Sequence, residues 1–187
     1  MIDTYLKGQS EQEDHVIHLL FSANRWEAAY VCPPTSLPIT LARRLIKRSA
    51  EITTAISAGI DVIVDRYYYS GIVYSAAKQK PSLSLEWARK PDEGLPRPDV
   101  CIYITISPDE AAKRGGFGEE RYEKQEMQER VRGLFGELQQ ASERTDFVEI
   151  DGGRALDAVE KDVLQAVEAR MGVVGASGEG LRTVQPW

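Results

Sequence analysis

The sequence predicts an α/β fold in which a parallel sheet is covered by helices on both faces, giving three layers. Three short apolar runs, residues 61–65, 100–106 and 147–150, have the length and content of buried strands. Helical periodicity separates these runs, and apolar strands separated by helices are typical of parallel sheets. A chain of 187 residues is long enough for one domain with a sizeable core.

The helices are expected where apolar residues recur at helical spacing or where composition favours a helix. These segments are residues 15–28, 39–58, 120–142 and 155–171. Gly59 follows the second of them and is expected to be its C-cap. Residues 172–187 are Gly-rich and aperiodic, so we expect a domain over residues 1–171 followed by a flexible tail.

Composition excludes several function classes. The net charge of −6 argues against a nucleic-acid backbone as partner. The two cysteines, Cys32 and Cys101, lie far apart in the sequence, which indicates a reduced environment in the cytoplasm or nucleus rather than a disulfide scaffold. No apolar run is long enough to cross a membrane, and no signal peptide is expected.

The end of the first apolar run carries the clearest functional signal. Asp65 and Arg66 close the run, and the chain then turns through Ser70 and Gly71 toward another apolar segment. Ligands of parallel α/β sheets bind beyond the carboxyl ends of the strands. An arginine there offers a planar, permanent charge suited to phosphate. These residues indicate a phosphate-handling enzyme, and an Arg–Asp ion pair without a function is the alternative.

Three further motifs accompany this one in a fixed order. The sequence reads His-Leu-Leu-Phe-Ser-Ala-Asn-Arg-Trp-Glu at 18–27, Asp-Arg-Tyr-Tyr-Tyr-Ser-Gly at 65–71, Pro-Asp-Glu-Gly-Leu-Pro-Arg-Pro-Asp at 91–99, and Ala-Lys-Arg-Gly-Gly-Phe-Gly-Glu-Glu-Arg-Tyr-Glu at 112–123. Together they resemble the eukaryotic type of thymidylate kinase, from about residue 2 to 27 and again from about residue 52 to 171. The resemblance implies a nucleoside monophosphate kinase-like (P-loop kinase) fold and phosphorylation of dTMP to dTDP by ATP with Mg²⁺.

The resemblance also implies a substrate site. It assigns Phe21 and Arg25, which are four residues apart on one helix face, to stacking on thymine and to a hydrogen bond with a base carbonyl. Arg66 would bind the dTMP phosphate and steady the transferring phosphoryl group, and Asp65 would contact Mg²⁺ through water. The other residues expected to line the dTMP site are Tyr69, Ser70, Gly71, Tyr74 and Tyr122. Arg114 would lie near ATP in a mobile Gly-rich lid.

Two segments depart from the family pattern. The family begins with a strand and a phosphate-binding loop ending in Gly-Lys-Ser/Thr, and no Gly-Lys pair occurs in this sequence. We therefore expect an N-terminally truncated domain that lacks its first two strands and is destabilised by unpaired strand edges. Residues 30–50 are an additional Pro-broken segment, either a genuine insertion or a retained intron.

Alternative functions stay open at this point. Without a phosphate-binding loop, the chain would be an inactive remnant that binds dTMP or a partner subunit at most. A relative of adenylate kinase fits less well, because Phe21, Arg25 and the Tyr-rich corner favour thymine. Without the resemblance, Phe21 and Arg25 read as a core side chain and a surface side chain of an amphipathic helix. The resemblance further implies a homodimer built on the helix that carries Phe21.

Overall fold

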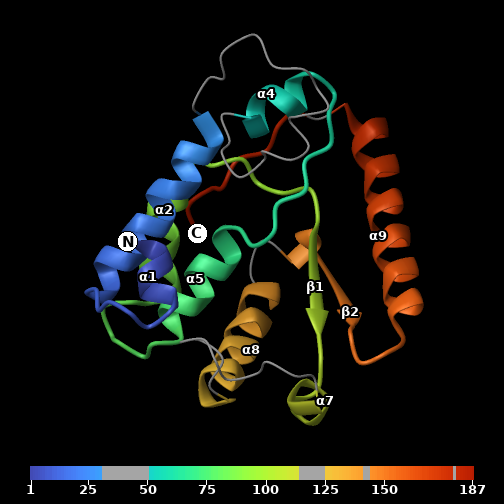
Figure 1. The fold of residues 1–187 in the computed structure, drawn as a ribbon. Helices are drawn as coiled ribbons and strands as arrows, with labels where there is room; N and C mark the ends of the chain where they lie inside the picture. Colours follow the sequence, from blue (N-terminus) through green and yellow to red (C-terminus); the bar gives the residue numbers. More distant parts are fainter. Residues whose placement is uncertain (31–50, 114–124, 141–143, 179) are drawn as a thin grey trace. The chain divides into compact units, whose positions relative to one another are not determined.

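The computed structural model describes residues 1–30, 51–113, 125–140, 144–178 and 180–187 (Figure 1). The chain divides into two compact units. Unit 1 comprises residues 1–5, 10–97 and 183–187, and unit 2 comprises residues 6–9 and 98–182. Residues 31–50, which make up nearly all of the additional segment, lie outside the described residues, as do Arg114 and Tyr122.

Unit 1 is helical in its described part. Its helices are α1 (Ile2–Leu6), α2 (Asp14–Tyr30), α4 (Glu51–Ser57), α5 (Tyr68–Ala76) and α6 (Leu85–Arg89), followed by the 3-10 helix η1 (Lys90–Asp92). α2 confirms the helix predicted over residues 15–28 and packs against α4 and α5. The apolar core of unit 1 is made of Tyr5, Ile17, Ile52, Tyr68, Tyr69, Ile72, Val73, Ala77, Leu83, Ala88, Leu95 and Val184.

The end of α4 shows how local chemistry stops a helix. Gly59 has a φ of +73°, and its N–H donates to the carbonyl of Ile56 at 2.9 Å. The next N–H, of Ile60, reaches back to the carbonyl of Ala55 at 2.9 Å. These two bonds satisfy carbonyls at the helix end, and glycine adopts the left-handed conformation without a Cβ clash. The predicted C-cap is confirmed.

The strand predicted over residues 61–65 is wrong for this structure. Residues 60–64 have no regular secondary structure, and the side chain of Ile63 is 88% exposed. A strand is stabilised by the hydrogen bonds of a neighbouring strand, and neither described strand pairs with this run. An apolar sequence alone therefore does not make this segment a strand.

Unit 2 contains the sheet. β1 (Cys101–Thr105) and β2 (Phe147–Asp151) pair in parallel, with Cys101 opposite Phe147 and Thr105 opposite Asp151. Both strands fall where apolar runs predict them, and their parallel direction is confirmed. Among the described residues the sheet has two strands instead of the three expected.

Unit 2 contains helices that overlap the segments predicted at residues 120–142 and 155–171, together with a short α-helix and a 3-10 helix that were not predicted. They are α7 (Pro108–Lys113), α8 (Gln125–Gln140), the 3-10 helix η2 (Arg144–Asp146) and α9 (Leu156–Ser177). α8 buries Met127, Val131, Phe135 and Leu138, which recur at helical spacing. The Phe135 ring stacks on Tyr103 of β1 at 4.5 Å, and α9 packs on β2.

Residues 172–187, for which a flexible tail is expected, begin inside a helix. α9 continues to Ser177, beyond its predicted end at residue 171, and stops at Gly178, whose φ is +63°. The final residues 183–187 belong to unit 1, where Val184 is only 1% exposed. Its backbone N–H and C=O both form hydrogen bonds, so sequence aperiodicity here marks a docked extended segment.

The described helices include none that has both the length and the apolar composition needed to span a bilayer.

Candidate functional site

Arg25 is the most buried charged group among the predicted site residues that the structure describes. α2 carries it on the face turned toward the core of unit 1, where it is 8% exposed. Its Nε donates to one oxygen of Asp92 at 3.0 Å and its Nη2 to the other at 2.6 Å. The Asp92 side chain is wholly buried and also accepts a hydrogen bond from the Ser22 hydroxyl at 2.7 Å. This two-point pairing fixes the plane of the guanidinium.

Gly71 provides the surface on which this guanidinium rests. A Cβ added at Gly71 would lie 2.8 Å from Nη1, 2.9 Å from Nη2 and 3.0 Å from Cζ of Arg25. Any side chain at position 71 would therefore displace the guanidinium or the helix. The structure thus brings Arg25 and Gly71, two predicted site residues, into direct proximity, although Gly71 lies inside α5 and not in an open turn.

A short turn holds Asp92 in place. The Leu95 N–H donates to the Asp92 carbonyl at 3.1 Å, and the Trp26 indole N–H donates to the Pro91 carbonyl at 2.5 Å. Trp26 adjoins Arg25 on α2, so one helix contacts both the turn backbone and the Asp92 carboxylate. Sequence reasoning used this Pro-Asp motif for the resemblance but assigned Asp92 no role. A single acidic residue in a proline-rich loop gives no signal that it is buried against an arginine.

Arg66 lies just before α5 and is exposed. Its φ of +60° places it in the left-handed region, which costs a non-glycine residue about 1–2 kcal/mol. Its guanidinium carbon sits 5.5 Å from the centre of the Tyr74 ring. Arg66 and Tyr74 are therefore close together, and Asp65 beside them is also exposed. Backbone strain of this kind is common at functional sites.

The other predicted residues of α2 and α5 differ in accessibility. Phe21, Ser70 and Tyr74 are half-buried, whereas Tyr69 is 3% exposed and lies 4.1 Å, centre to centre, from the Tyr68 ring. Tyr69 therefore packs the core beneath α5, and a direct contact of Tyr69 with a substrate stays a prediction.

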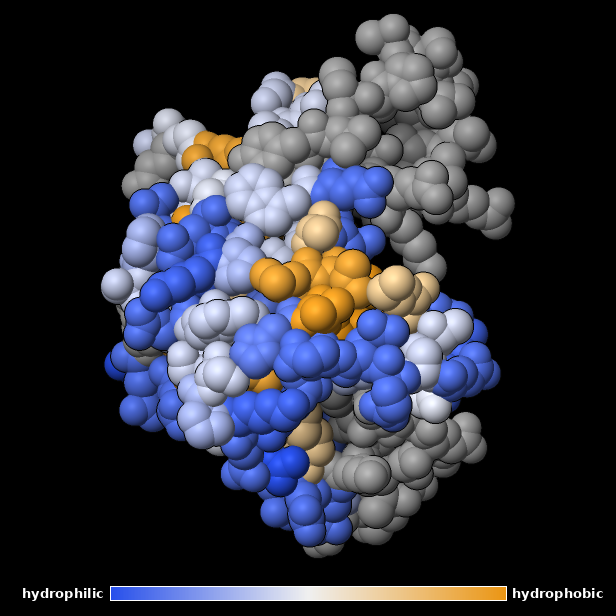
Figure 2. All heavy atoms as spheres, turned by 90° about the vertical axis from the view of Figure 1, so that its left-hand side faces the viewer, coloured by the Kyte–Doolittle hydropathy of each residue, from blue (hydrophilic) through white to orange (hydrophobic). Residues whose placement is uncertain are grey.

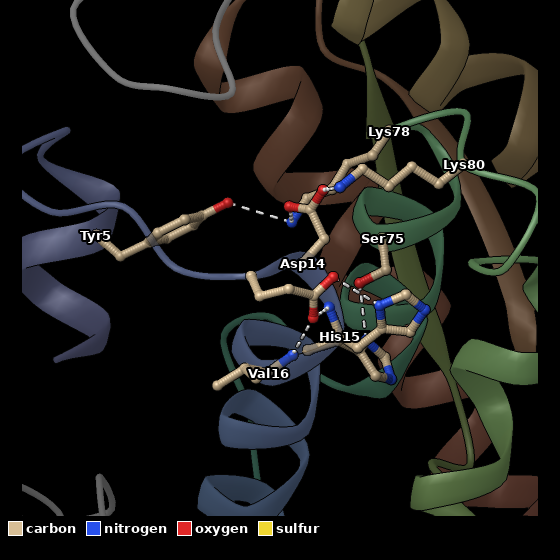
Figure 3. Close-up of polar contacts among 9 residues, drawn as sticks. Tyr5, Asp14, His15, Val16, Ser75, Lys78 and Lys80 are labelled. Atoms are coloured by element: carbon tan, nitrogen blue, oxygen red, sulfur yellow. Dashed lines mark hydrogen bonds and ion pairs between the residues drawn. The ribbon is translucent and has the colours of Figure 1, made fainter.

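A polar cluster lies farther along α2 and α5. The Asp14 carboxylate accepts from Lys78 at 2.8 Å and pairs with Lys80 at 2.6 Å, and Lys78 also donates to the Tyr5 hydroxyl at 3.2 Å (Figure 3). Burial alone would raise the pKa of Asp14, but the two lysines outweigh it and hold this pKa below its usual value. These contacts tie α1 and α2 to the end of α5.

His18 is buried beside this cluster. Its Nδ1 lies 2.7 Å from the Ser75 hydroxyl, and its ring centre lies 5.2 Å from that of Trp87. Burial lowers the pKa of His18, and the nearby positive charge of Arg25 lowers it further. Neutral His18 is therefore a core residue, as the sequence predicts for a histidine without metal-ligand neighbours.

The described residues do not form a first coordination shell for a metal. They contain no group of three or more His, Cys, Asp or Glu side chains arranged around one point. Asp65 therefore has no companions for direct Mg²⁺ coordination within this part of the chain. A contact of Asp65 with Mg²⁺ through water stays a prediction.

Comparison with known proteins gives one consistent family. The family model described as thymidylate kinase matches residues 1–163. The chain is 42% identical to thymidylate kinase of Schizosaccharomyces pombe over 168 residues, covering 89% of this chain and 69% of that protein. It is 36% identical to the Homo sapiens enzyme over 163 residues, covering 87% of this chain and 66% of that enzyme.

A solved structure agrees with these relatives. The thymidylate kinase of Candida albicans superposes with a TM-score of 0.68 at 27% identity, covering 98% of this chain and 79% of that one. The chain thus spans about two thirds of the length of several curated relatives, and 53% of the Arabidopsis thaliana protein. The matched family model, the identities and the shared structure together place this chain in the thymidylate kinase family, nucleotide kinases that convert dTMP to dTDP.

Proposed function

We propose that this chain forms the dTMP site of a thymidylate kinase and that the site lies along α2 and α5 of unit 1. Arg25 and Phe21 would bind the base, and Arg66 would bind the phosphate. Ser70, Gly71 and Tyr74 would line the site between the base and the phosphate. The observation that carries the proposal is the arginine fixed by Asp92 against Gly71.

The geometry of Arg25 suits recognition of a base carbonyl. Asp92 occupies Nε and Nη2, and Nη1 makes no hydrogen bond within the described part of the chain. A guanidinium held along one edge retains N–H donors on the other, and its orientation is set before any ligand arrives. Little conformational entropy would be lost on binding, and this favours affinity. Thymine offers a carbonyl where cytosine offers an amino group, so a fixed donor discriminates between them.

Arg66 suits the phosphate. It is exposed and lies beside Tyr74 and the first turn of α5. A permanent charge with several donors can hold the dTMP phosphate and offset charge that develops during phosphoryl transfer. Phosphoryl transfer depends mainly on positioning and charge stabilisation, so loss of Arg66 should lower both binding and rate.

ATP with Mg²⁺ is the phosphoryl donor of the family. Arg114, which we propose lies near ATP, and Tyr122, which we propose closes over the nucleoside, lie outside the described residues. The proposal for the donor therefore rests on family membership, and the proposal for dTMP rests on unit 1.

Calorimetry with dTMP, and separately with AMP, tests the site. The chain should bind dTMP and prefer it to AMP, and Arg66→Ala should weaken dTMP binding by about tenfold or more. Lys90→Ala is a matched control, since Lys90 is an exposed cation of unit 1 paired with Glu86 on the surface. Equal affinity for AMP and dTMP would contradict thymine recognition. Formation of dTDP from dTMP and ATP distinguishes a kinase from a chain that only binds.

We also infer a homodimer through α2. Val16 and Leu19 are 45% and 46% exposed, and Ala23 is exposed on the same face. Figure 2 views the side on which α1 and α2 lie and shows an apolar patch there. A helix stripe of this kind can be covered by the same stripe of a second copy about a two-fold axis.

Light scattering coupled to size exclusion tests the dimer. The parent should elute with twice the mass of the 20.9 kDa chain, and Leu19→Glu should shift it toward one chain. Leu164→Glu is the control, because Leu164 is similarly exposed, at 53%, but lies on α9. A parent that remains a monomer at high concentration would contradict the dimer.

A further inference from the structure

Residues 183–187, here called the C-terminal strap, make an ordered set of contacts in unit 1. The Gly94 N–H donates to the Val184 carbonyl at 2.8 Å, and the Val184 N–H donates to the Leu95 carbonyl at 2.8 Å. Thr183 forms an antiparallel bridge with Pro96. The Val184 side chain is 1% exposed. The strap therefore pairs with the backbone immediately after Asp92.

The strap also contacts a buried arginine. Arg89, at the end of α6, is 2% exposed, and its Nε and Nη2 donate to the Gln185 carbonyl at 2.9 and 2.7 Å. Its guanidinium carbon lies 5.1 Å from the Trp187 ring and 5.9 Å from the Tyr68 ring. Arg89 thus links the strap to Tyr68, the first residue of α5.

The turn held by the strap contacts α2 on its other side. Gly94 has a φ of +92°, and a Cβ there would lie 3.2 Å from the Trp26 ring. Trp26 donates to Pro91, and Arg25 pairs with Asp92. Residues 91–95 therefore lie between α2 and the strap, with the partner of Arg25 among them.

We propose that the C-terminal strap is a positioning element for thymine recognition. It holds the 91–95 turn so that Asp92 fixes the Arg25 guanidinium, and through Arg89 it holds the start of α5, against which that guanidinium lies. The strap residues touch no substrate in this proposal. Their effect reaches the base through Asp92 and Arg25, so it concerns affinity and selectivity for the base and leaves the phosphate contact of Arg66 unchanged. The inference rests on the proposed dTMP site.

The test compares dTMP with an analogue that lacks the 4-carbonyl oxygen of the base. Calorimetry on the 187-residue parent should show a preference for dTMP of about tenfold or more, the effect of one charge-assisted hydrogen bond. Trp187→Ala should reduce that preference severalfold and weaken dTMP binding. Gln185→Ala is the matched control: among the described residues its side chain forms hydrogen bonds only with Thr183 of the strap, and its backbone carbonyl still accepts from Arg89.

A double variant separates positioning from general destabilisation. Arg25→Lys should abolish the preference, and Arg25→Lys combined with Trp187→Ala should lose no more. Far-UV circular dichroism verifies that Trp187→Ala is folded, which is expected because Trp187 is 47% exposed. Parent-like preference in Trp187→Ala, or additive losses in the double variant, would overturn the strap proposal alone. A parent that binds neither ligand, or binds both equally, would overturn the dTMP site and the strap proposal with it.

Discussion

Replacing Asp92 with asparagine tests the central feature of the site. The side chains of Arg25 and Asp92 are 10% and 0% exposed, and two hydrogen bonds of 3.0 and 2.6 Å join them. Removing one partner of a buried ion pair leaves the other charge uncompensated and typically costs about 3–5 kcal/mol. The Ser22 hydroxyl, 2.7 Å from the same carboxylate, keeps an acceptor in the variant. We expect the free energy of unfolding of unit 1 to fall by about 3–5 kcal/mol.

Tryptophan fluorescence during urea unfolding measures this loss selectively. The chain has three tryptophans, and Trp26, Trp87 and Trp187 all belong to unit 1. Glu86→Gln is the control, because it makes the same carboxylate-to-amide change at an exposed pair with Lys90 and should cost less than about 0.5 kcal/mol.

The double replacement of Arg25 and Asp92 sharpens the result. Arg25→Met with Asp92→Leu should be less destabilising than either single replacement, because no buried charge is left alone. If Asp92→Asn lowers the free energy of unfolding by less than about 1 kcal/mol, Arg25 and Asp92 do not form a buried ion pair shielded from water.

Four further predictions follow from single positions. Gly71→Ala should weaken dTMP binding by about tenfold or more, because a Cβ would lie 2.8 Å from Nη1 of Arg25, while circular dichroism stays native; unchanged calorimetric affinity would contradict it. Burial, and then the charge of Arg25, lower the pKa of His18 below 6.5, so the contribution of neutral His18 to folding stability should be complete above pH 6.5 and decline as the pH falls below it. The midpoint of urea unfolding should therefore fall less steeply toward low pH in His18→Asn than in the parent. Burial raises the pKa of Cys101 to about 11, so native protein at pH 8 should resist iodoacetamide there until unfolded, as read by peptide mass spectrometry. Gly59→Ala should cost about 1–2 kcal/mol in urea unfolding through its φ of +73° alone, since nothing lies within 4 Å of the added Cβ.

The elements that the sequence predicts well are those whose signal is local. The helical periodicity of apolar residues predicts α2, and continuous apolar runs predict β1 and β2. Gly59 ends its helix, as expected of a glycine at that position. Residues 61–65 have an equally strong strand signal and do not form one, because a strand requires a partner that composition cannot supply.

The candidate site shows the same division. The resemblance names Arg25 and Gly71, and the structure brings them together. It assigns no role to Asp92, which is buried through a contact with Arg25, 67 residues earlier in the sequence. The contacts of residues 183–187 escape prediction for the same reason, since the partners of Val184 lie about ninety residues earlier. Long-range pairing is invisible to a window of neighbouring residues.

The discontinuity of unit 1 has a consequence for how the protein is made. Residues 1–5 and 10–97 emerge from the ribosome well before residues 183–187, and residues 98–182 of unit 2 are synthesised between them. Unit 1 therefore cannot bury Val184 or cover Arg89 during most of translation. Closing so long a loop adds an entropic cost and slows folding, so unit 1 should be completed only after residues 183–187 have emerged.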